Sequence, residues 1–442
     1  MKFHWCLRLV SFLFIIIGLC AQWQPSFGAA GINMQSLISR NVYCYAGGAS
    51  CAYRSANDAA SFALSNAGND QVGPTRGFAA DVSFMYTCTS QGVFRSADNG
   101  ATWLTKSVGL PSLLGSGILK VQSDLFVVGP VGVFRSSDQA NSWAAAGLAG
   151  TDVRCIAAIG NVIFVGTNGV GIFKSFDFGV TWLPANAGLT SVTFRAIEAK
   201  GTILFAGGQI GTGVFRSIDL GLNWTLLGGG LPVSSYRGFA SNDRLIFAGS
   251  FGSGVYYSND NGDHWLAINS GLTDLSIFDL EIHRGYLLAA TNIQGVFRFP
   301  LSKLPFSEFG TGCAGSSGVP ALASVGGSFP RLNTTFQLDI SNLPAGPQVV
   351  FGVLGLSDTA WGTIPLPFDL SALGMPTCTQ YISLDSTFLL LSSGFSVSWQ
   401  IPIPAQSGIV GTSFFSQAIL LDLGVNAFGA VVTNYGSANI IN

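Results

Sequence analysis

The segment Gly92-Val-Phe-Arg-Ser96-Ala-Asp98-Asn-Gly100-Ala-Thr102-Trp103 contains the motif on which the fold prediction rests. The same order of residue types recurs four more times, in segments that end at Trp143, Trp182, Trp224 and Trp265. Subtracting successive tryptophan positions gives spacings of 40, 39, 42 and 41 residues. A period near this length, with several short strands in each period, is typical of a β-propeller.

Each period contains four strand-like runs, which is the number of strands in a propeller blade. In one period these runs are residues 153–159, 162–166, 171–175 and 181–184. The motif also has incomplete copies at both ends of the series. A degenerate copy ends at Phe62, and the last copy keeps only the strand that leads into the motif, at residues 295–300.

We therefore predict seven blades, with six or eight as alternatives. The last blade lacks a fourth strand in the sequence that follows it. Because an open sheet edge is unfavourable, we expect this blade to borrow a strand across the chain termini.

The motif Ser-x-Asp-x-Gly-x-Thr-Trp resembles the Asp box of the Asp-box (BNR repeat) propellers, over about residues 33–304. That family includes sialidases, sortilin-like receptors, xyloglucan-cleaving enzymes and photosystem II assembly propellers. The resemblance implies a β-propeller, and because the box occurs in catalytic and non-catalytic members alike, it implies no single activity.

The motif has an aspartate in each full copy, and we predict a structural role for all five. An aspartate in a tight turn can accept hydrogen bonds from backbone N–H groups. A catalytic aspartate would not be needed once in every repeat. The predicted structural aspartates are Asp98, Asp138, Asp177, Asp219 and Asp260.

The N-terminal residues have the order of a signal peptide. Lys2 and Arg8 are basic, residues 9–21 are apolar, and small residues follow at positions 26, 28, 29 and 30. The apolar run is too short for a typical transmembrane helix. We predict a signal peptide over residues 1–30 and a mature chain that is secreted, periplasmic or on the cell surface, without a transmembrane span. An uncleaved N-terminal anchor is the alternative.

Export would permit disulfide bonds. Cys44 and Cys51 flank a glycine-rich turn and form one candidate pair. Cys313 and Cys378 lie together in the C-terminal region and form the second. The cysteines in apolar strand segments are predicted to be buried thiols: Cys88 and Cys155.

The composition changes after Leu304, because Arg331 is the only basic residue between positions 305 and 442. Apolar runs separated by proline and glycine predict a β-sandwich-like domain over 305–442, after a propeller over 31–304. The predicted strands are residues 335–340, 348–354, 387–391, 395–402 and 418–423.

Three stretches of this region, at residues 310–315, 364–370 and 414–426, resemble a module found at the C-terminus of secreted bacterial multidomain proteins. The resemblance implies a secreted or cell-surface location and no particular activity. Cys313 and Cys378 match the cysteine positions of the module, which supports pairing them.

Four arginines recur at one position of the repeat. Arg76, Arg154, Arg195 and Arg237 lie 20, 21, 22 and 21 residues before the serines of their boxes, at positions 96, 175, 217 and 258. We expect each to begin the innermost strand of its blade, on the face opposite the box turns. Converging guanidinium groups suit recognition of carboxylate or phosphate. The alternative is that each arginine packs between blades or on backbone carbonyls.

The sequence shows no recognisable catalytic set. The phenylalanine–arginine pairs inside the repeat are expected on outer blade surfaces, at Arg95, Arg135, Arg216 and Arg298. A glycosidase needs two carboxyl groups at a defined separation. The acids near opening strands show no spacing that singles out such a pair: Asp152, Glu198, Asp279 and Glu281.

We therefore predict a secreted, non-catalytic propeller that binds an extracellular protein or glycan. The alternative is an exo-acting glycoside hydrolase, either sialidase-like or xyloglucanase-like. The net charge of −2 gives no reason to expect nucleic acid. No residue pattern predicts a metal or a cofactor, and nothing in the sequence indicates the oligomeric state.

Overall fold

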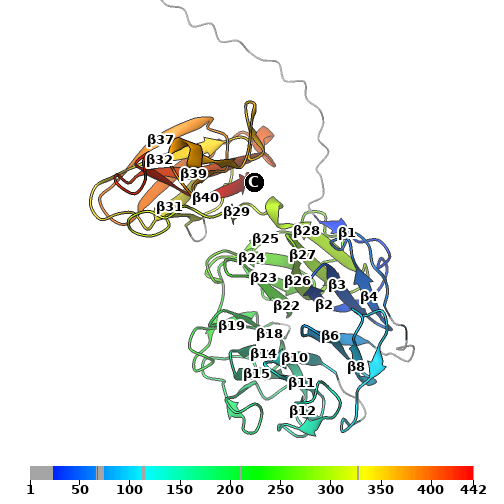
Figure 1. Cartoon of the computed structure of the whole chain (residues 1–442). Helices are drawn as coiled ribbons and strands as arrows, with labels where there is room; N and C mark the ends of the chain where they lie inside the picture. The colour runs from blue at the N-terminus through cyan, green and yellow to red at the C-terminus, as the bar shows by residue number, and fades with distance from the viewer. Residues whose placement is uncertain are drawn as a thin grey trace, which may run out of the picture.

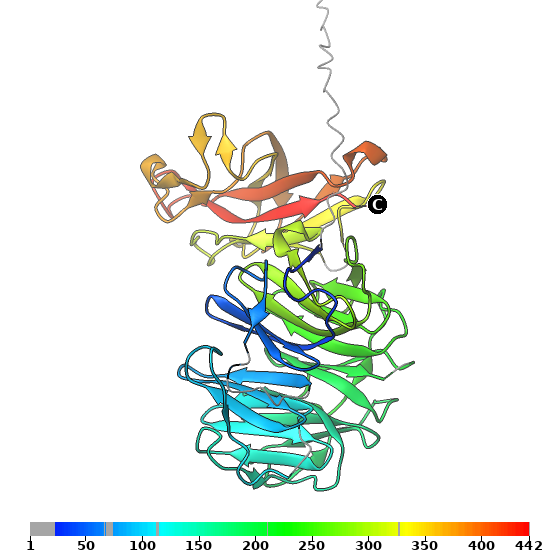
Figure 2. The ribbon, with the colours of Figure 1, turned by 90° about the vertical axis from the view of Figure 1, so that its right-hand side faces the viewer.

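The computed structural model describes residues 23–65, 67, 74–111, 115–209, 211–325 and 328–441 (Figures 1 and 2). Residues 1–22 of the expected signal peptide lie outside this part. The described chain is built from β-strands and three short 3-10 helices, η1 (Leu301–Lys303), η2 (Leu370–Leu373) and η3 (Ser407–Ile409). Within it, no helix has the length and apolar character needed to cross a membrane.

Seven four-stranded antiparallel sheets in the described residues form the propeller, which confirms the predicted blade number. Six of them use four strands that are consecutive in the chain. In chain order these strands are β2 (Met34–Arg40), β3 (Tyr43–Gly48), β4 (Ala52–Ser55), β5 (Ala63–Leu64); β6 (Thr75–Ala80), β7 (Met85–Thr89), β8 (Gly92–Ser96), β9 (Leu104–Thr105); β10 (Gly117–Val121), β11 (Asp124–Gly129), β12 (Gly132–Ser136), β13 (Ala144–Ala145); β14 (Val153–Ile159), β15 (Val162–Thr167), β16 (Ile172–Ser175), β17 (Leu183–Pro184); β18 (Phe194–Lys200), β19 (Ile203–Gly208), β20 (Val214–Ser217), β21 (Thr225–Leu226); β22 (Tyr236–Ser241), β23 (Ile246–Ser250), β24 (Gly254–Ser258), β25 (Leu266–Ala267).

The second strand of each blade is buried on both faces, because neighbouring blades cover it from either side. Every residue of β7, β11 and β23 is buried. These strands consequently read as continuous apolar or small-residue runs, whereas the short fourth strands at the outer edge are exposed.

The seventh blade closes the ring with a strand from the other end of the propeller. It combines β26 (Ile277–His283), β27 (Tyr286–Thr291) and β28 (Val296–Pro300) with β1 (Gln24–Pro25). Strand β1 pairs with β28 through Gln24 opposite Arg298 and Pro25 opposite Phe297. The predicted borrowing of a strand is confirmed, and the propeller begins at Trp23 instead of the expected residue 31.

Trp23 is the box tryptophan that the seventh repeat lacks in sequence. It precedes β1 as Trp103 precedes β9, and it is fully buried. Its indole N–H donates to the carbonyl of Ile268, three residues after Trp265. The N-terminal segment therefore completes both the sheet and the repeat.

Four of the five box tryptophans join their blade to the one before it. Trp143 Nε1 donates to the Lys106 carbonyl at 2.8 Å, and Trp182 Nε1 donates to the Ala146 carbonyl at the same distance. In both cases the acceptor is the third residue after the preceding box tryptophan. Trp265 is different, because its N–H donates to the Gly262 carbonyl inside its own turn.

The box turns are held by their aspartates. Ser136 Oγ donates to Asp138 Oδ1 at 2.8 Å, and the Ser142 N–H donates to the same oxygen at 2.9 Å. Ser142 Oγ donates to Oδ2 at 2.6 Å. These hydrogen bonds from Ser142 hold the pKa of Asp138 down at about 2. The other box aspartates make equivalent bonds: Asp98, Asp177, Asp219 and Asp260.

The C-terminal domain packs a five-stranded antiparallel sheet against a three-stranded one. The order is β29-β40-β39-β32-β37 in the larger sheet and β30-β31-β38 in the smaller. Trp399 and Phe336 lie in the core between them, with Val350 and Leu420. The strands of this domain are β29 (Phe306–Phe309), β30 (Ala321–Ser324), β31 (Thr335–Ser341), β32 (Gln348–Gly355), β33 (Ala360–Trp361), β34 (Ile364–Pro365), β35 (Phe368–Asp369), β36 (Thr379–Gln380), β37 (Ser386–Ser392), β38 (Val397–Pro402), β39 (Ser413–Leu421) and β40 (Ala430–Asn439).

One of the two predicted disulfides is present. Cys313 and Cys378 are bonded. The prediction that Cys44 pairs with Cys51 is wrong, because both thiols are free and the hairpin register separates them. Cys44 lies opposite Ser55, well away from the turn that holds Cys51. Burial raises the pKa of the Cys44 thiol to about 12.

The two domains meet at the sixth and seventh blades. The rings of Tyr257 and Phe329 lie 5.8 Å apart across the junction, and Asn259 Nδ2 donates to Ser324 Oγ at 2.5 Å. Arg244 and Glu308 form an ion pair at 3.5 Å. Figures 1 and 2 show the C-terminal domain beside the rim of the propeller, next to β24, β25 and β28.

We expect Trp23→Ala to lower the free energy of unfolding by about 3–5 kcal/mol, because it empties a fully buried indole site at the ring closure. Phe27→Ala is the matched control, since Phe27 is 76% exposed. Urea denaturation monitored by tryptophan fluorescence measures both. A Trp23 variant as stable as the control would contradict this account of closure.

Candidate functional site

The innermost strands of six blades each carry a β-bulge near their first residue. A bulge inserts one extra residue and redirects its side chain. The residues at these bulges are Gln35, Arg76, Arg154, Arg195, Arg237 and Phe278. In the third blade, Ser116 holds the matching position directly before β10. Every blade therefore has one residue at the repeat position where four of the blades have an arginine.

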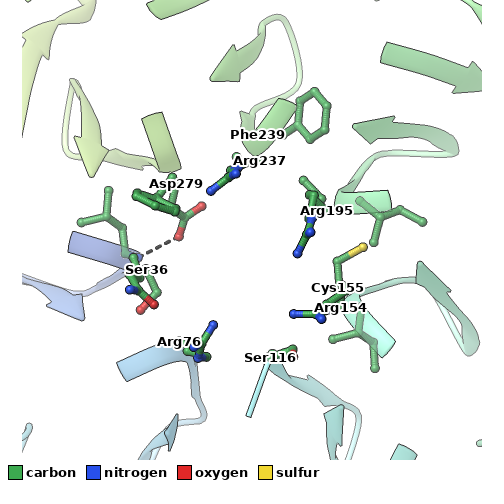
Figure 3. Close-up of a pocket in the computed structure, with 18 of the residues that line it drawn as sticks. Ser36, Arg76, Ser116, Arg154, Cys155, Arg195, Arg237, Phe239 and Asp279 are labelled. Atoms are coloured by element: carbon green, nitrogen blue, oxygen red, sulfur yellow. Dashed lines mark hydrogen bonds between the residues drawn. The ribbon is translucent and has the colours of Figure 1, made fainter. Parts of the chain in front are cut away.

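These seven residues line one cavity of about 310 Å³ in the central channel, which we call the arginine mouth. Figure 3 shows the guanidinium groups of Arg154, Arg195 and Arg237 along one side and Arg76 across from them. The structure thus brings together the four arginines that the sequence singled out by position.

The strand register places the arginine mouth on the face opposite the box turns. In the second blade, Thr75 lies opposite Thr89, which lies opposite Gly92 at the start of β8. The other end of the same blade pairs Ala80 with Met85, and Met85 with the box residue Ser96. Arg76 and the box therefore occupy opposite ends of the blade.

Arg154 has a carboxylate partner. It forms an ion pair with Asp152, and Asn168 Nδ2 donates to the same carboxylate oxygen at 3.0 Å. No carboxylate in the described part of the chain lies within ion-pair distance of the other three arginines: Arg76, Arg195 and Arg237. The mouth thus carries excess positive charge.

Arg237 lies between two aromatic rings. Its guanidinium carbon is 3.9 Å from the centroid of Phe251 and 5.0 Å from that of Phe278. Burial lowers the pKa of Arg237, and the nearby charge of Arg195 lowers it further. Burial and the charge of Arg154 lower the pKa of Arg195 in the same way. The three guanidinium groups are therefore close enough to repel one another.

Part of the donor capacity of these arginines is unused. The Nε–H groups of Arg154, Arg195 and Arg237 are buried and find no hydrogen-bond acceptor among the described residues. A buried donor without an acceptor costs free energy. An anion bound between the arginines would supply acceptors and reduce their mutual repulsion.

Carboxyl groups lie in the channel beside the arginine mouth. Asp279 and Glu198 line the same cavity. Burial raises the pKa of each to about 7. Glu281 is further along β26, and burial together with the charge of Asp279 raises its pKa well above the ordinary value.

These carboxyl groups also connect innermost strands of neighbouring blades, which do not pair with each other in a sheet. Asp279 Oδ2 accepts from the Leu37 N–H at 2.8 Å, and Glu281 Oε1 accepts from the Ser39 N–H at 3.0 Å. Glu198 Oε1 accepts from Ser241 Oγ at 2.7 Å. Asp279 and Glu281 therefore connect the seventh blade to the first, at the closure of the ring.

The other predicted positions lie away from the mouth or are chemically inert. Arg95 donates to the Gln139 carbonyl and Arg216 to the Asn261 carbonyl, both with their side chains on the box half of the blade. Cys155 lines the cavity, but burial raises the pKa of its thiol to about 12. The same cause raises the pKa of Cys88 to about 12.

Sequence reasoning missed Gln35, Ser116 and Phe278 because they share no chemistry with the arginines. Aligning the repeats on their boxes would have located them. The seventh repeat has no box after β28, so the strand at 295–300 serves as the reference. Phe278 lies 21 residues before Phe299, which takes the box-serine position in that strand.

Neither a protein-family model nor a curated protein matches the sequence. Solved structures do match. YCF48 bound to a D1 peptide has a TM-score of 0.51 at 13% identity, covering 63% of this chain and 97% of that one. The GH74 xyloglucanase from Xanthomonas campestris has a TM-score of 0.55 at 13% identity, covering 90% and 79%.

PorZ, a bacterial surface component of the type-IX secretion system of Porphyromonas gingivalis, has a TM-score of 0.51 at 13% identity. The match covers 92% of this chain and 59% of PorZ. Because all these identities are low, the likeness shows the fold alone. The chain is a β-propeller followed by a β-domain.

We expect the protein to lose stability as the pH rises from about 4 to about 7. An ordinary carboxyl group has a pKa near 4, whereas Asp279 and Glu198 keep their protons to about 7 in the folded chain. In that interval the folded state binds more protons than the unfolded state, so the free energy of unfolding falls with rising pH.

Urea midpoints at pH 5.5 and pH 8 measure this effect, and the midpoint should be lower at pH 8. Asp279→Asn and Glu198→Gln should each reduce the difference. Asp243→Asn, on an exposed loop outside the channel, should leave it unchanged. Equal midpoints, or a higher one at pH 8, would show that these groups do not hold their protons.

Proposed function

We propose that this protein is a secreted, non-catalytic Asp-box propeller that binds an anionic group of an extracellular protein or glycan in the arginine mouth. The observation that carries the proposal is the convergence of four arginines from four blades on one cavity, three of them with a buried Nε–H that has no acceptor in the described chain. Guanidinium groups bind carboxylate, sulfate and phosphate oxygens through paired, charge-assisted hydrogen bonds.

The size of the cavity supports a small anionic group as the ligand. At about 310 Å³ it lies at the lower end of the range for small-molecule pockets. One sugar residue or a few side-chain atoms would fill it. YCF48, which has the same fold, is bound to a peptide in its solved structure. This supports a protein partner, and a glycan stays the other candidate.

Secretion is supported by two features. The N-terminal sequence has the order of a signal peptide. The Cys313–Cys378 disulfide suits an oxidising compartment. The box geometry, with its aspartate bonded to the turn in five repeats, supports membership of the Asp-box propellers.

The Arg154→Ala, Arg195→Ala double variant should lose binding by about 100-fold or more, because a hydrogen bond to a charged group contributes about 1.5–3 kcal/mol. The measurement is an array of acidic glycans, neutral glycans and acidic peptides, followed by calorimetry on the ligands that bind.

The matched control is Arg95→Ala, Arg216→Ala, which removes the same charge from the outer blade surfaces. This control should keep wild-type affinity. If both double variants bind alike, the ligand does not occupy the arginine mouth. An absence of acidic ligands among those that bind would likewise overturn the proposal.

A glycoside hydrolase is the second candidate, and one observation favours it. Glu198 and Asp279 line the same cavity and keep their protons to about pH 7, so either is available as a general acid near neutral pH. Against this, both oxygens of Asp279 accept backbone hydrogen bonds, from Leu37 and Leu280.

We expect no turnover of fluorogenic acidic or neutral glycosides between pH 5 and pH 8. Should turnover appear, Glu198→Gln decides its origin. Loss of turnover in that variant would replace the non-catalytic proposal with a hydrolase whose acid is Glu198. Unchanged turnover would point to a contaminating enzyme and leave the proposal standing.

A further inference from the structure

Strand β37, which spans Ser386–Ser392, is an unprotected edge of the C-terminal domain. It pairs with β32 on one side and with no strand on the other side in the described chain. The pairing runs through seven residues without a register shift. Figure 1 shows β37 on the side of the domain that faces away from the propeller. Its outer backbone N–H and C=O groups are therefore available to another strand.

The four middle side chains of β37, at 388–391, are apolar on both faces of the sheet, and no side chain of the strand is charged. Leu389 and Leu391 point to the outer face and are 61% and 71% exposed. Phe388 points inward, contacts Trp399 and is still 41% exposed at the edge. An exposed, flat, apolar edge strand is a template for pairing with a further strand.

The other edges of the two main sheets are protected. In β30, the backbone N–H of Leu322 donates to Asn434 Oδ1 at 2.7 Å, and its carbonyl accepts from Asn434 Nδ2 at 2.9 Å. Strand β38 exposes Ser398 and Gln400 and ends at Pro402, which has no N–H to donate. Strand β29 lies against the propeller, where Glu308 pairs with Arg244. Protection by charge, proline, a bulge or bonded side chains is missing from β37 alone among these edges.

We propose that β37 pairs antiparallel with β37 of a second copy of this chain, about a two-fold axis at Leu389. In this register Leu389 meets Leu389 of the second copy, Phe388 meets Leu390, and Ser386 meets Ser392. The strand sequence Ser-Thr-Phe-Leu-Leu-Leu-Ser is apolar in the middle and has a serine at each end, so it is complementary to itself when reversed. A two-fold interface requires this self-complementarity, whereas a strand from an unrelated partner does not.

Charge does not prevent a second copy from pairing at this edge. Residues 305–442 contain one basic residue, Arg331, and six acidic ones, so two copies of the domain repel each other over most of their surface. The acid nearest to β37 in sequence is Asp385, one residue before the strand. In the proposed register Asp385 lies opposite Ser393 of the second copy, and no carboxylate faces another across the edge. Strand β37 is thus an edge on which two copies can meet without like charges in contact.

The first test is the mass of the whole chain in solution, by analytical ultracentrifugation over a range of concentrations. We expect a dimer that dissociates on dilution. Leu389→Lys, Leu391→Lys places charges on the shared edge and should give a monomer. The matched control is Ile218→Lys, Leu222→Lys, which replaces two residues 73% and 63% exposed on the propeller and should leave the dimer intact.

The second test reads the register directly. Leu389→Cys places the two new thiols opposite each other across the axis and should form a covalent dimer on mild oxidation. Thr387→Cys is the control, because its partner would be Leu391 and the two new thiols would lie about 13 Å apart along the strands.

A wild-type chain that is monomeric at every concentration would overturn the proposal. So would a dimer that Leu389→Lys, Leu391→Lys leaves intact, since the contact would then lie elsewhere. Equal cross-linking of the two cysteine variants would overturn the register. Thermal melting of each variant checks that the fold is retained. We expect it to be, because the replaced side chains are exposed.

Discussion

The hydrogen bond from a box tryptophan to the backbone of the preceding blade is the constraint on which the propeller depends. Each such bond fixes the distance and angle between two neighbouring sheets, and each indole fills the space between them. The aspartate in the same turn holds the tryptophan where it can reach its acceptor. This contact recurs at five of the seven joints between the described blades and helps to set the curvature that lets seven sheets close.

Closure brings the ends of the propeller together in the seventh blade. There Trp23 arrives from the N-terminal side and completes the repeat that β28 leaves unfinished. On the other side of the seventh blade, next to the channel, the carboxyl groups of Asp279 and Glu281 accept hydrogen bonds from backbone N–H groups of β2 in the first blade. Buried acids therefore serve the closure and also set part of the electrostatics of the channel.

The sequence was sufficient to predict the features that repeat. The box period predicted seven blades, and the shared position of four arginines predicted that they meet. Trp23 could not be predicted, because its short strand lies among the small and polar residues that follow an apolar leader and has no box before it. The pairing of Cys44 with Cys51 was wrong for a related reason, since hairpin register depends on where the turn begins and not on how near two residues lie in sequence.

In the C-terminal domain too, the sequence predicted strands that have a local apolar pattern and missed one that depends on long-range contacts. Five apolar runs predicted strands that the structure contains, with ends shifted by a few residues. The long strand β40 was missed, because its polar residues Thr433, Asn434 and Asn439 are buried and bonded within the fold instead of alternating with apolar ones.

The direction of the chain at the two ends of the propeller has a consequence for how the molecule is presented. Trp23 precedes β1 at the box end of the seventh blade, and η1 leaves β28 at that same end on its way to the C-terminal domain. Any attachment made through the segment before Trp23 or through the C-terminal domain would therefore join the propeller away from the arginine mouth. The four arginines lie at the opposite end of the blades, so the mouth would stay accessible to a ligand while the protein is held in this way.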